Sequence, residues 1–112
     1  MIEPGALLAY ARELSADERE VAQRTAVSRA YYAAFLQLRQ SALDASSLPG
    51  QRTAADHYRL QRLLKDVAHL RTQHVCRWLR ELRNQADYDL AEAFGLRSSR
   101  TALALAQTLI AR

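Results

Sequence analysis

The sequence is poor in the residues that interrupt regular structure and in those that cross-link or bind metals. It has only three glycines and two prolines in 112 residues, and these two residue types mark turns more strongly than any others. Long helices are therefore expected. The single cysteine, Cys76, cannot form a disulfide within the chain, and three scattered histidines with one thiol do not form a zinc site. We expect no metal and no cofactor.

Long apolar runs are missing as well. No segment approaches the roughly eighteen consecutive apolar residues that a membrane span requires. The N-terminus lacks the basic start and apolar stretch of a signal peptide. These absences predict a cytoplasmic protein with no membrane partner. The hydrophobic fraction of 49% and the charged fraction of 25% are ordinary for a globular protein. Residues 1–112 are therefore expected to form a single domain with one core.

Lysine is nearly absent, and the positive charge of the chain is carried by arginine. Lys65 is the one lysine among sixteen basic residues, and the net charge is +4. Positive charge favours polyanionic partners such as nucleic acid, and the planar guanidinium suits bidentate contacts with phosphate. A GC-rich coding sequence also raises the arginine and alanine content together, and we favour this simpler explanation for the arginine bias. The charge therefore admits an RNA partner without identifying one.

Apolar residues recur at helical spacing in the first half of the chain. A first helix is expected over residues 4–14, opened by a proline as helix starts tolerate. Ser15 and Glu18 have the spacing of a capping box, which predicts that a second helix begins there. This second helix should run to about Asp44, where the stretch "ASSLPGQRT" supplies a break.

The second half of the chain predicts two or three further helices. Thr53 should cap a third helix, and a fourth should place Leu79, Leu82 and Ala86 on its inner face. The stretch "HLRTQH" is the expected break between them. Gly95 and the serines after it predict another turn before a final helix in "TALALAQTLIAR". These elements predict an all-α fold, an antiparallel bundle of four or five helices.

Two arginines lie on apolar helix faces. Arg29 falls among alanines and tyrosines of the second helix, and Arg83 falls between Leu79 and Ala86 on the fourth. A desolvated guanidinium without a partner costs several kcal/mol, so each needs a carboxylate or a bound anion. Asp87 is one turn after Arg83 and can pair with it, but it can also reach across to Arg29 and leave Arg83 for a phosphate. Alternatively, the two arginines and Asp87 form one ion-pair network that fixes the helix register, which periodicity alone favours.

Two stretches of the chain resemble the HEPN family of helical domains. "SRAYYAAFLQL", which begins at Ser28, is similar to the family's Ser-Arg-Ala-Tyr-Tyr-Ala pattern. "LRELRNQADYD", which ends at Asp89, is similar to its Leu-x-x-x-Arg-Asn-x-Ala-Asp-Tyr pattern, as found in the small bacterial stand-alone branch. His57 also falls where such relatives often place a histidine. The resemblance implies a HEPN-like bundle that forms homodimers and acts in a toxin–antitoxin or defence module.

The resemblance also implies an activity. Many HEPN proteins are metal-independent endoribonucleases whose motif is Arg, a polar residue and, after four to six positions, His. The RNA 2′-hydroxyl attacks the adjacent phosphorus, histidine serves as acid or base, and arginine stabilises the anionic phosphorane. Arg83 and Asn84 match the start of this motif, but no imidazole follows at the required spacing, where Tyr88 stands instead. The implied catalytic residues are thus Arg83, Asn84 and Tyr88, with His57 as an auxiliary candidate, in a ribonuclease or a relative that has lost its base.

Other residues allow a functional and a structural interpretation. Four arginines form either an RNA-facing patch or a merely solvated surface, with about equal weight: Arg77, Arg80, Arg97 and Arg100. Four aromatic residues can stack on bases, but aromatics at helical spacing are more often core: Tyr31, Tyr32, Phe35 and Trp78. The stripe that His57 shares with apolar residues is more typical of a hydrogen-bonded core histidine than of a catalytic group.

A second function of a different class follows from the same resemblance. Small HEPN proteins are often encoded beside a minimal nucleotidyltransferase, an antitoxin partner that they bind. In that case the chain is a non-catalytic interaction module, and Tyr88 is a partner contact or a modification target. A homodimer is expected in either case, because the second helix has two apolar sides that a small bundle does not easily cover.

Overall fold

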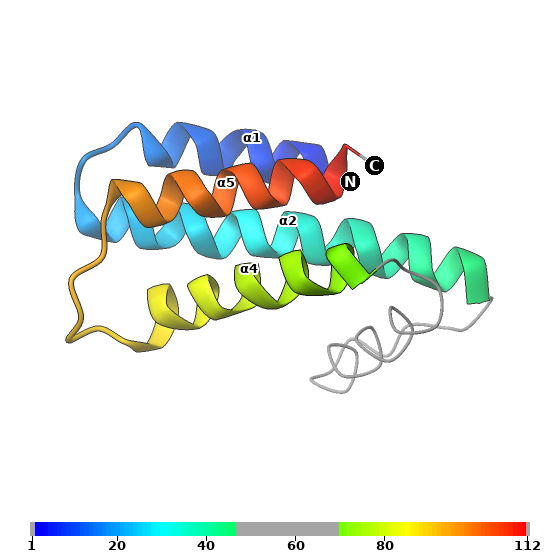
Figure 1. The fold of residues 1–112 in the computed structure, drawn as a ribbon. Helices are drawn as coiled ribbons and strands as arrows, with labels where there is room; N and C mark the ends of the chain where they lie inside the picture. The colour runs from blue at the N-terminus through cyan, green and yellow to red at the C-terminus, as the bar shows by residue number, and fades with distance from the viewer. Residues whose placement is uncertain (1, 47–69, 112) are drawn as a thin grey trace.

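The computed structural model describes residues 2–46 and 70–111, which form four helices (Figure 1). These are α1 (Pro4–Ser15), α2 (Glu20–Ser46), α4 (Leu70–Tyr88) and α5 (Leu96–Ile110). The described residues contain no strand, and the expected all-α bundle is confirmed. The third helix expected after Thr53, and His57 with it, lie outside the described residues.

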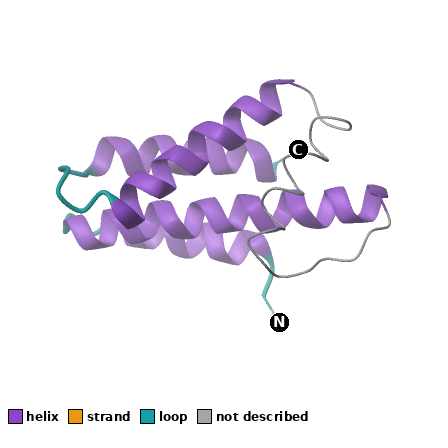
Figure 2. Cartoon of the chain, turned by 90° about the horizontal axis from the view of Figure 1, so that it is seen from below, coloured by secondary structure: helices purple, strands orange, loops and turns teal. Residues whose placement is uncertain are grey.

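α2 is the central element of the bundle. It packs against α1, α4 and α5, and α1 also contacts α5. In Figure 1, α1 and α5 lie above α2 and α4 lies below it, and the chain direction reverses from α1 to α2 and from α4 to α5. Figure 2 shows from below that the four helices run roughly along one common direction. The C-terminal end of α4 therefore lies near the N-terminal half of α2.

Alanine forms much of the contact between these helices. Seven alanines of α1, α2 and α5 are at most 1% exposed: Ala11, Ala26, Ala30, Ala33, Ala34, Ala102 and Ala106. Small side chains at a contact let helix axes approach closely, and alanine is also the best helix former. Larger residues such as Val27 and Leu79 fill the remaining space, and burying one such side chain contributes about 2 kcal/mol. The core explains why the long α2 is stable without a strongly one-sided pattern.

The capping box expected from Ser15 and Glu18 at the start of α2 is wrong. Ser15 is the last residue of α1, and its Oγ donates to the carbonyl oxygen of Arg12 at 2.7 Å. Asp17 stabilises the turn before α2 instead. Its Oδ1 accepts a hydrogen bond from the backbone N–H of Arg19 at 3.0 Å. The Arg19 side chain also donates to this carboxylate, and these hydrogen bonds lower the pKa of Asp17 to about 2.

Two other expected breaks are also helical. Leu70 begins α4 inside the stretch "HLRTQH", so residues 70–74 are helix and not a turn. α5 begins at Leu96, so Ser98 and Ser99 lie in its first turn and not in the loop before it. Serine is tolerated there because a first turn has unpaired backbone groups that polar side chains and water can satisfy.

A buried glutamine joins α2 to both neighbouring segments. Gln23 is buried, and its Nε2 donates to the carbonyl oxygens of Ser15 and Asp17, the former at 2.8 Å. Its Oε1 accepts the hydroxyl of Ser99, which is fully buried in α5. A buried amide is tolerated only when its donors and acceptor are satisfied. Gln23 therefore holds the turn before α2 and the start of α5 in one arrangement.

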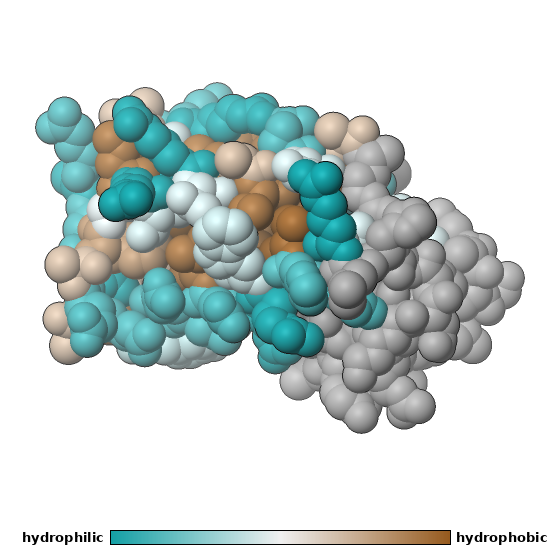
Figure 3. Space-filling view, in the orientation of Figure 1, coloured by the Kyte–Doolittle hydropathy of each residue, from teal (hydrophilic) through white to brown (hydrophobic). Residues whose placement is uncertain are grey.

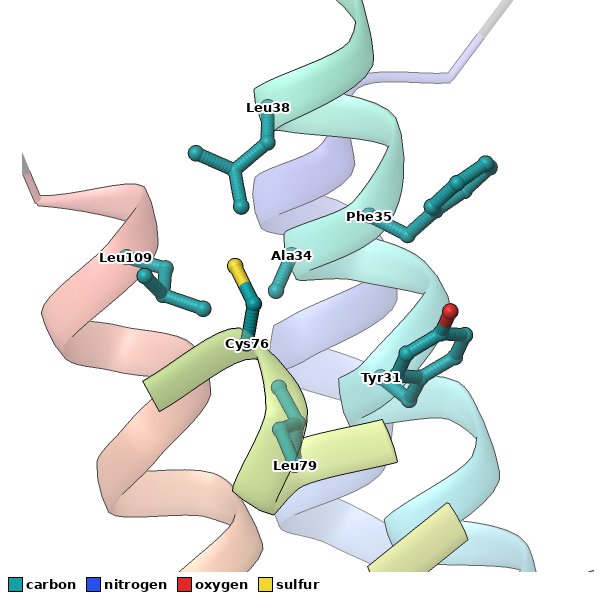
Figure 4. A pocket seen from close by; sticks show the side chains of 7 residues that line it. All are labelled: Tyr31, Ala34, Phe35, Leu38, Cys76, Leu79 and Leu109. Carbon is teal, nitrogen blue, oxygen red and sulfur yellow. The ribbon is translucent and has the colours of Figure 1, made fainter. Parts of the chain in front are cut away.

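Cys76 is part of the packing between α4 and its neighbours. It lies in a small pocket between α2 and α5 that is lined by Tyr31, Ala34, Phe35, Leu38, Leu79 and Leu109 (Figure 4). The thiol is buried. Among the described helices, none is long and apolar enough to cross a membrane.

Candidate functional site

Arg83 lies near the C-terminal end of α4 and reaches toward α2. Its Nη2 donates to the hydroxyl of Tyr32 at 2.9 Å, and its Nη1 donates to Oδ1 of Asn84 at 3.1 Å. The hydroxyl of Tyr88 is 3.5 Å from Nη2, at the outer limit of a hydrogen bond. The structure thus brings together the three residues of the implied motif and adds Tyr32 from α2.

Aromatic rings surround the Arg83 guanidinium. Its central carbon lies 5.7, 5.4 and 5.2 Å from the ring centres of Tyr31, Tyr32 and Tyr88, respectively. Cations over aromatic faces are stabilised by the ring quadrupole. Burial alone would lower the pKa of Arg83, but the neighbouring tyrosines and Asp87 outweigh it and raise the pKa above the ordinary value. Arg83 is therefore always positively charged.

Asp87 pairs with Arg83 on one edge only. Its Oδ2 lies 3.0 Å from Nε of Arg83, yet the Nε–H makes no aligned hydrogen bond, so the contact is an ion pair alone. The two side chains are 17% and 28% exposed, and such partly exposed pairs contribute about 0.3–0.5 kcal/mol. The Nη edge of Arg83 faces Tyr32 and the exposed Tyr88. Arg83 is thus neutralised in part without being enclosed.

Arg29 is half-buried and has different partners from Arg83. Its Nη2 donates to Oγ of Ser28 at 3.3 Å, and its central carbon lies 5.3 Å from the ring centre of Tyr32. Within residues 2–46 and 70–111 it forms no ion pair with a carboxylate. Oγ of Ser28 donates in turn to Oδ2 of Asp87 at 3.3 Å. Asp87 therefore reaches Arg29 only through a neutral hydroxyl, and the expected direct pairing of these two residues is wrong.

The four arginines of the expected basic patch are all exposed: Arg77 and Arg80 on α4, and Arg97 and Arg100 in the first turns of α5. Trp78, on the same helix as the first two, is 52% exposed, so the expectation of a core position is wrong for it. His74 is exposed on α4, and no imidazole of the described residues contacts Arg83. This exposure agrees equally with an RNA-facing patch and with a solvated surface.

A third arginine, Arg24 of α2, was not singled out by the sequence patterns. It is 8% exposed, and its Nη1 donates to the carbonyl oxygens of Gln85 and Ala86, each at 3.0 Å. Its Nη2 donates to the carbonyls of Asp89, at 3.2 Å, and Glu92. The last carbonyls of a helix lack intrahelical partners and carry partial negative charge. Arg24 therefore caps the C-terminal end of α4.

Glu20 completes this capping arrangement. Its Oε2 lies 3.3 Å from Nε of Arg24, and its Oε1 accepts the backbone N–H of Phe94 at 3.0 Å. The Phe94 ring centre lies 5.2 Å from the Arg24 guanidinium. The spacing of Glu20 and Arg24, one helical turn apart, was a visible signal for an ion pair. Their main targets are backbone groups, however, which no sequence pattern identifies.

The described residues contain no group of three or more metal-ligating side chains that can hold a metal ion. No family model, curated protein or solved structure matches this chain. The family resemblance therefore depends on the two sequence patterns, which the structure places against one another at the contact of α2 with α4.

Proposed function

We propose that this chain is an RNA-associated protein of the HEPN type and that Arg83 is its phosphate-binding group. One observation carries the proposal: Asp87 pairs only with Nε of Arg83, while the Nη atoms meet neutral oxygens. These belong to Tyr32, Asn84 and, at 3.5 Å, the hydroxyl of Tyr88, which is 67% exposed. The planar guanidinium suits bidentate contact with a phosphate, and a phosphate can displace neutral hydroxyl and amide oxygens. Exposed arginines on α4 extend the positive surface from this point.

The groups around Arg83 fit binding better than rapid cleavage. In RNA cleavage the guanidinium would stabilise the negative charge that develops on the phosphorane. Proton transfer needs a further group, and among the described residues the hydroxyls that reach Arg83 are those of Tyr32, at 2.9 Å, and Tyr88, at 3.5 Å. A phenol hydroxyl is a weaker proton acceptor than an imidazole, but it donates well to a phosphate oxygen. The chain is therefore proposed as a weak endoribonuclease toxin or a relative that binds RNA without cleaving it.

Incubation of the purified protein with total RNA, beside an Arg83→Ala variant, tests the enzymatic form. Cleavage by the wild type without added metal, and its loss in Arg83→Ala, would support a ribonuclease. Equal cleavage by both proteins would reject it, because a contaminating nuclease then explains the products. Binding of a single-stranded RNA followed through the fluorescence of Trp78, the one tryptophan of the chain, tests association separately. Absence of any RNA binding at low salt would reject the proposal as a whole.

The second candidate function is a non-catalytic module that binds a minimal nucleotidyltransferase. The observation that favours it is the exposure of Tyr88 and Leu90, which are 67% and 70% exposed just after the motif. An exposed tyrosine beside an exposed leucine is typical of a protein contact. Co-expression with such an enzyme should recover a complex from the wild type, and Leu90→Ser should weaken it. Recovery of no complex from the wild type would reject this function.

A homodimer that acts in a toxin–antitoxin or defence module in the cytoplasm belongs to the same proposal. The apolar Val21 and Leu36 are exposed on α2, on the side that also presents Tyr32. Figure 3 shows an apolar band that crosses one face of the bundle between hydrophilic margins. Light scattering at micromolar concentration should give twice the mass of one chain, 12.7 kDa. Expression should arrest growth in the wild type and not in Arg83→Ala.

A further inference from the structure

Two guanidinium groups flank one tyrosine ring at the contact of α2 with α4. The central carbons of Arg29 and Arg83 lie 5.3 and 5.4 Å from the ring centre of Tyr32. The two positive charges are therefore neighbours that share contact with one aromatic ring. Like charges at such separations repel, and the repulsion is stronger where the groups are partly removed from water.

One carboxylate is shared by this pair. Asp87 contacts Nε of Arg83 directly, at 3.0 Å, and it reaches Arg29 only through Ser28. The cluster of Arg29, Arg83 and Asp87 thus carries one net positive charge. A half-buried guanidinium that faces a neutral hydroxyl and an aromatic ring has lost part of its hydration without gaining an ionic partner. Such a group is stabilised when an anion binds.

We propose that Arg29 is a second phosphate contact, acting with Arg83 to bind the phosphodiester backbone of single-stranded RNA. The inference rests on the proposed function, since it takes RNA as the ligand and adds a residue to its site. A phosphodiester carries a single negative charge, which matches the single net positive charge of the cluster. Both guanidinium groups lie beside the Tyr32 ring, so in this proposal one strand contacts both.

This role has a consequence for stability that an internal ion pair does not share. If Arg29 held the helices together through a carboxylate, its replacement by glutamine would lower the melting temperature. As an anion contact, its replacement removes a like-charge repulsion with Arg83. Arg29→Gln should therefore melt at the same temperature as the wild type or higher, while it binds RNA more weakly. Binding sites often carry such a conflict between stability and function.

The experiment compares Arg29→Gln, Arg83→Gln and a control, Arg12→Gln, by thermal unfolding and by RNA binding. Arg12 is exposed on α1, which contacts α2 and α5 and not α4, and its replacement changes the net charge equally. The probe is a single-stranded RNA of twelve nucleotides without terminal phosphates and with an uncharged dye, followed by fluorescence anisotropy. Its affinity is measured over a range of salt concentrations.

Arg29→Gln should reduce RNA affinity several-fold and lower the slope of log affinity against log salt by about 0.7, the value for one phosphate contact on a single strand. Arg83→Gln should do the same, and Arg12→Gln should leave the slope unchanged. Arg29→Lys should restore the slope and only part of the affinity, because lysine keeps the charge without the planar fork.

Two results would overturn the assignment of Arg29 and leave that of Arg83 in place. One is an unchanged salt slope in Arg29→Gln while Arg83→Gln loses binding. The other is a clear drop in the melting temperature of Arg29→Gln, which would show a structural role. If wild-type protein does not bind the RNA at all, the proposed function itself fails. If the three glutamine variants bind equally, RNA contacts another surface and the site is wrong for both arginines.

Discussion

Arg24 and Arg29 lie on the same helix, little more than one turn apart, and have opposite surroundings. Arg24 is buried and donates to two backbone carbonyls at the end of α4 and to two in the segment that follows it. Arg29 is half-buried and donates to one hydroxyl. Backbone carbonyls are permanent partners that belong to the fold. With so few partners among the described residues, the Arg29 guanidinium is available for a ligand that binds reversibly.

The two regions also differ in how their charges are balanced. At the Arg24 end, Glu20 and the negative end of the α4 dipole offset the positive charge. At the Arg83 end, two guanidinium groups share Asp87. The Arg24 region also anchors the segment that follows Tyr88, so it fixes the place where the candidate site ends. The capping contacts of Arg24 and the proposed binding site at Arg83 thus lie at different places along one helix pair, and substitutions can test whether their roles differ.

Arg24→Ala should have the largest effect on stability. The substitution removes the buried guanidinium, so the carbonyl groups at the end of α4 lose their hydrogen-bond donors. Loss of such charged hydrogen bonds lowers the free energy of unfolding by about 3 kcal/mol. Urea unfolding followed by circular dichroism measures the change. Arg29→Ala is the control on the same helix, and it should shift the unfolding free energy by less than about 0.5 kcal/mol. Equal losses for the two variants would contradict the division between structural and binding arginines.

Gln23→Ala should rank second. Gln23 bridges the turn before α2 and Ser99 of α5, and its loss leaves buried polar groups without partners. Each such group costs about 1–3 kcal/mol, so a loss of about 2 kcal/mol is expected. Gln85→Ala removes an exposed amide on α4 and should be nearly neutral. A neutral Gln23→Ala would mean that water replaces the amide easily.

Tyr32→Phe should have a smaller effect and acts on the binding side of the comparison. It removes the hydroxyl that accepts from Arg83 at 2.9 Å and keeps the ring beside both guanidinium groups. We expect a loss of about 1 kcal/mol in unfolding free energy, with Tyr10→Phe, an exposed tyrosine on α1, as the control. A loss as large as that of Arg24→Ala would show that the Arg83 cluster supports the fold as much as the cap does.

The helical class and the core of α4 could be predicted from the sequence, because a scarcity of glycine and proline and the apolar period of 3.6 residues are local signals. Leu79, Leu82 and Ala86 are buried as expected. The pairing of Arg83 with Asp87 was one of two alternatives that spacing allowed. The boundaries at Ser15 and Ser99 could not be predicted, because serine suits the ends of helices as well as their caps.

Neither the role of Arg24 nor the exposure of Trp78 could be predicted from the sequence. Arg24 donates to carbonyl groups, which every residue has, so nothing in the sequence of α4 indicates the contact. Trp78 falls near an apolar stripe, but a tryptophan one position from the core face can turn its ring to solvent. In both cases the outcome depends on how the helices are rotated against each other. The apolar period of a helix identifies its buried face only to within about one residue.

The smallest expected effect concerns Asp17, whose carboxylate has a low pKa because of hydrogen bonds to Arg19. A pKa of about 2 in the folded state lies below the ordinary value near 3.9. The ionised carboxylate therefore stabilises the fold above about pH 4, and this contribution is lost as the pH falls toward 2. Since Asp17 is in contact with solvent, the contribution should be slight. NMR titration should show the low pKa in the wild type and a higher one in Arg19→Ala. An unchanged pKa in Arg19→Ala would assign the effect to the start of α2 instead, where the helix dipole also favours a negative charge.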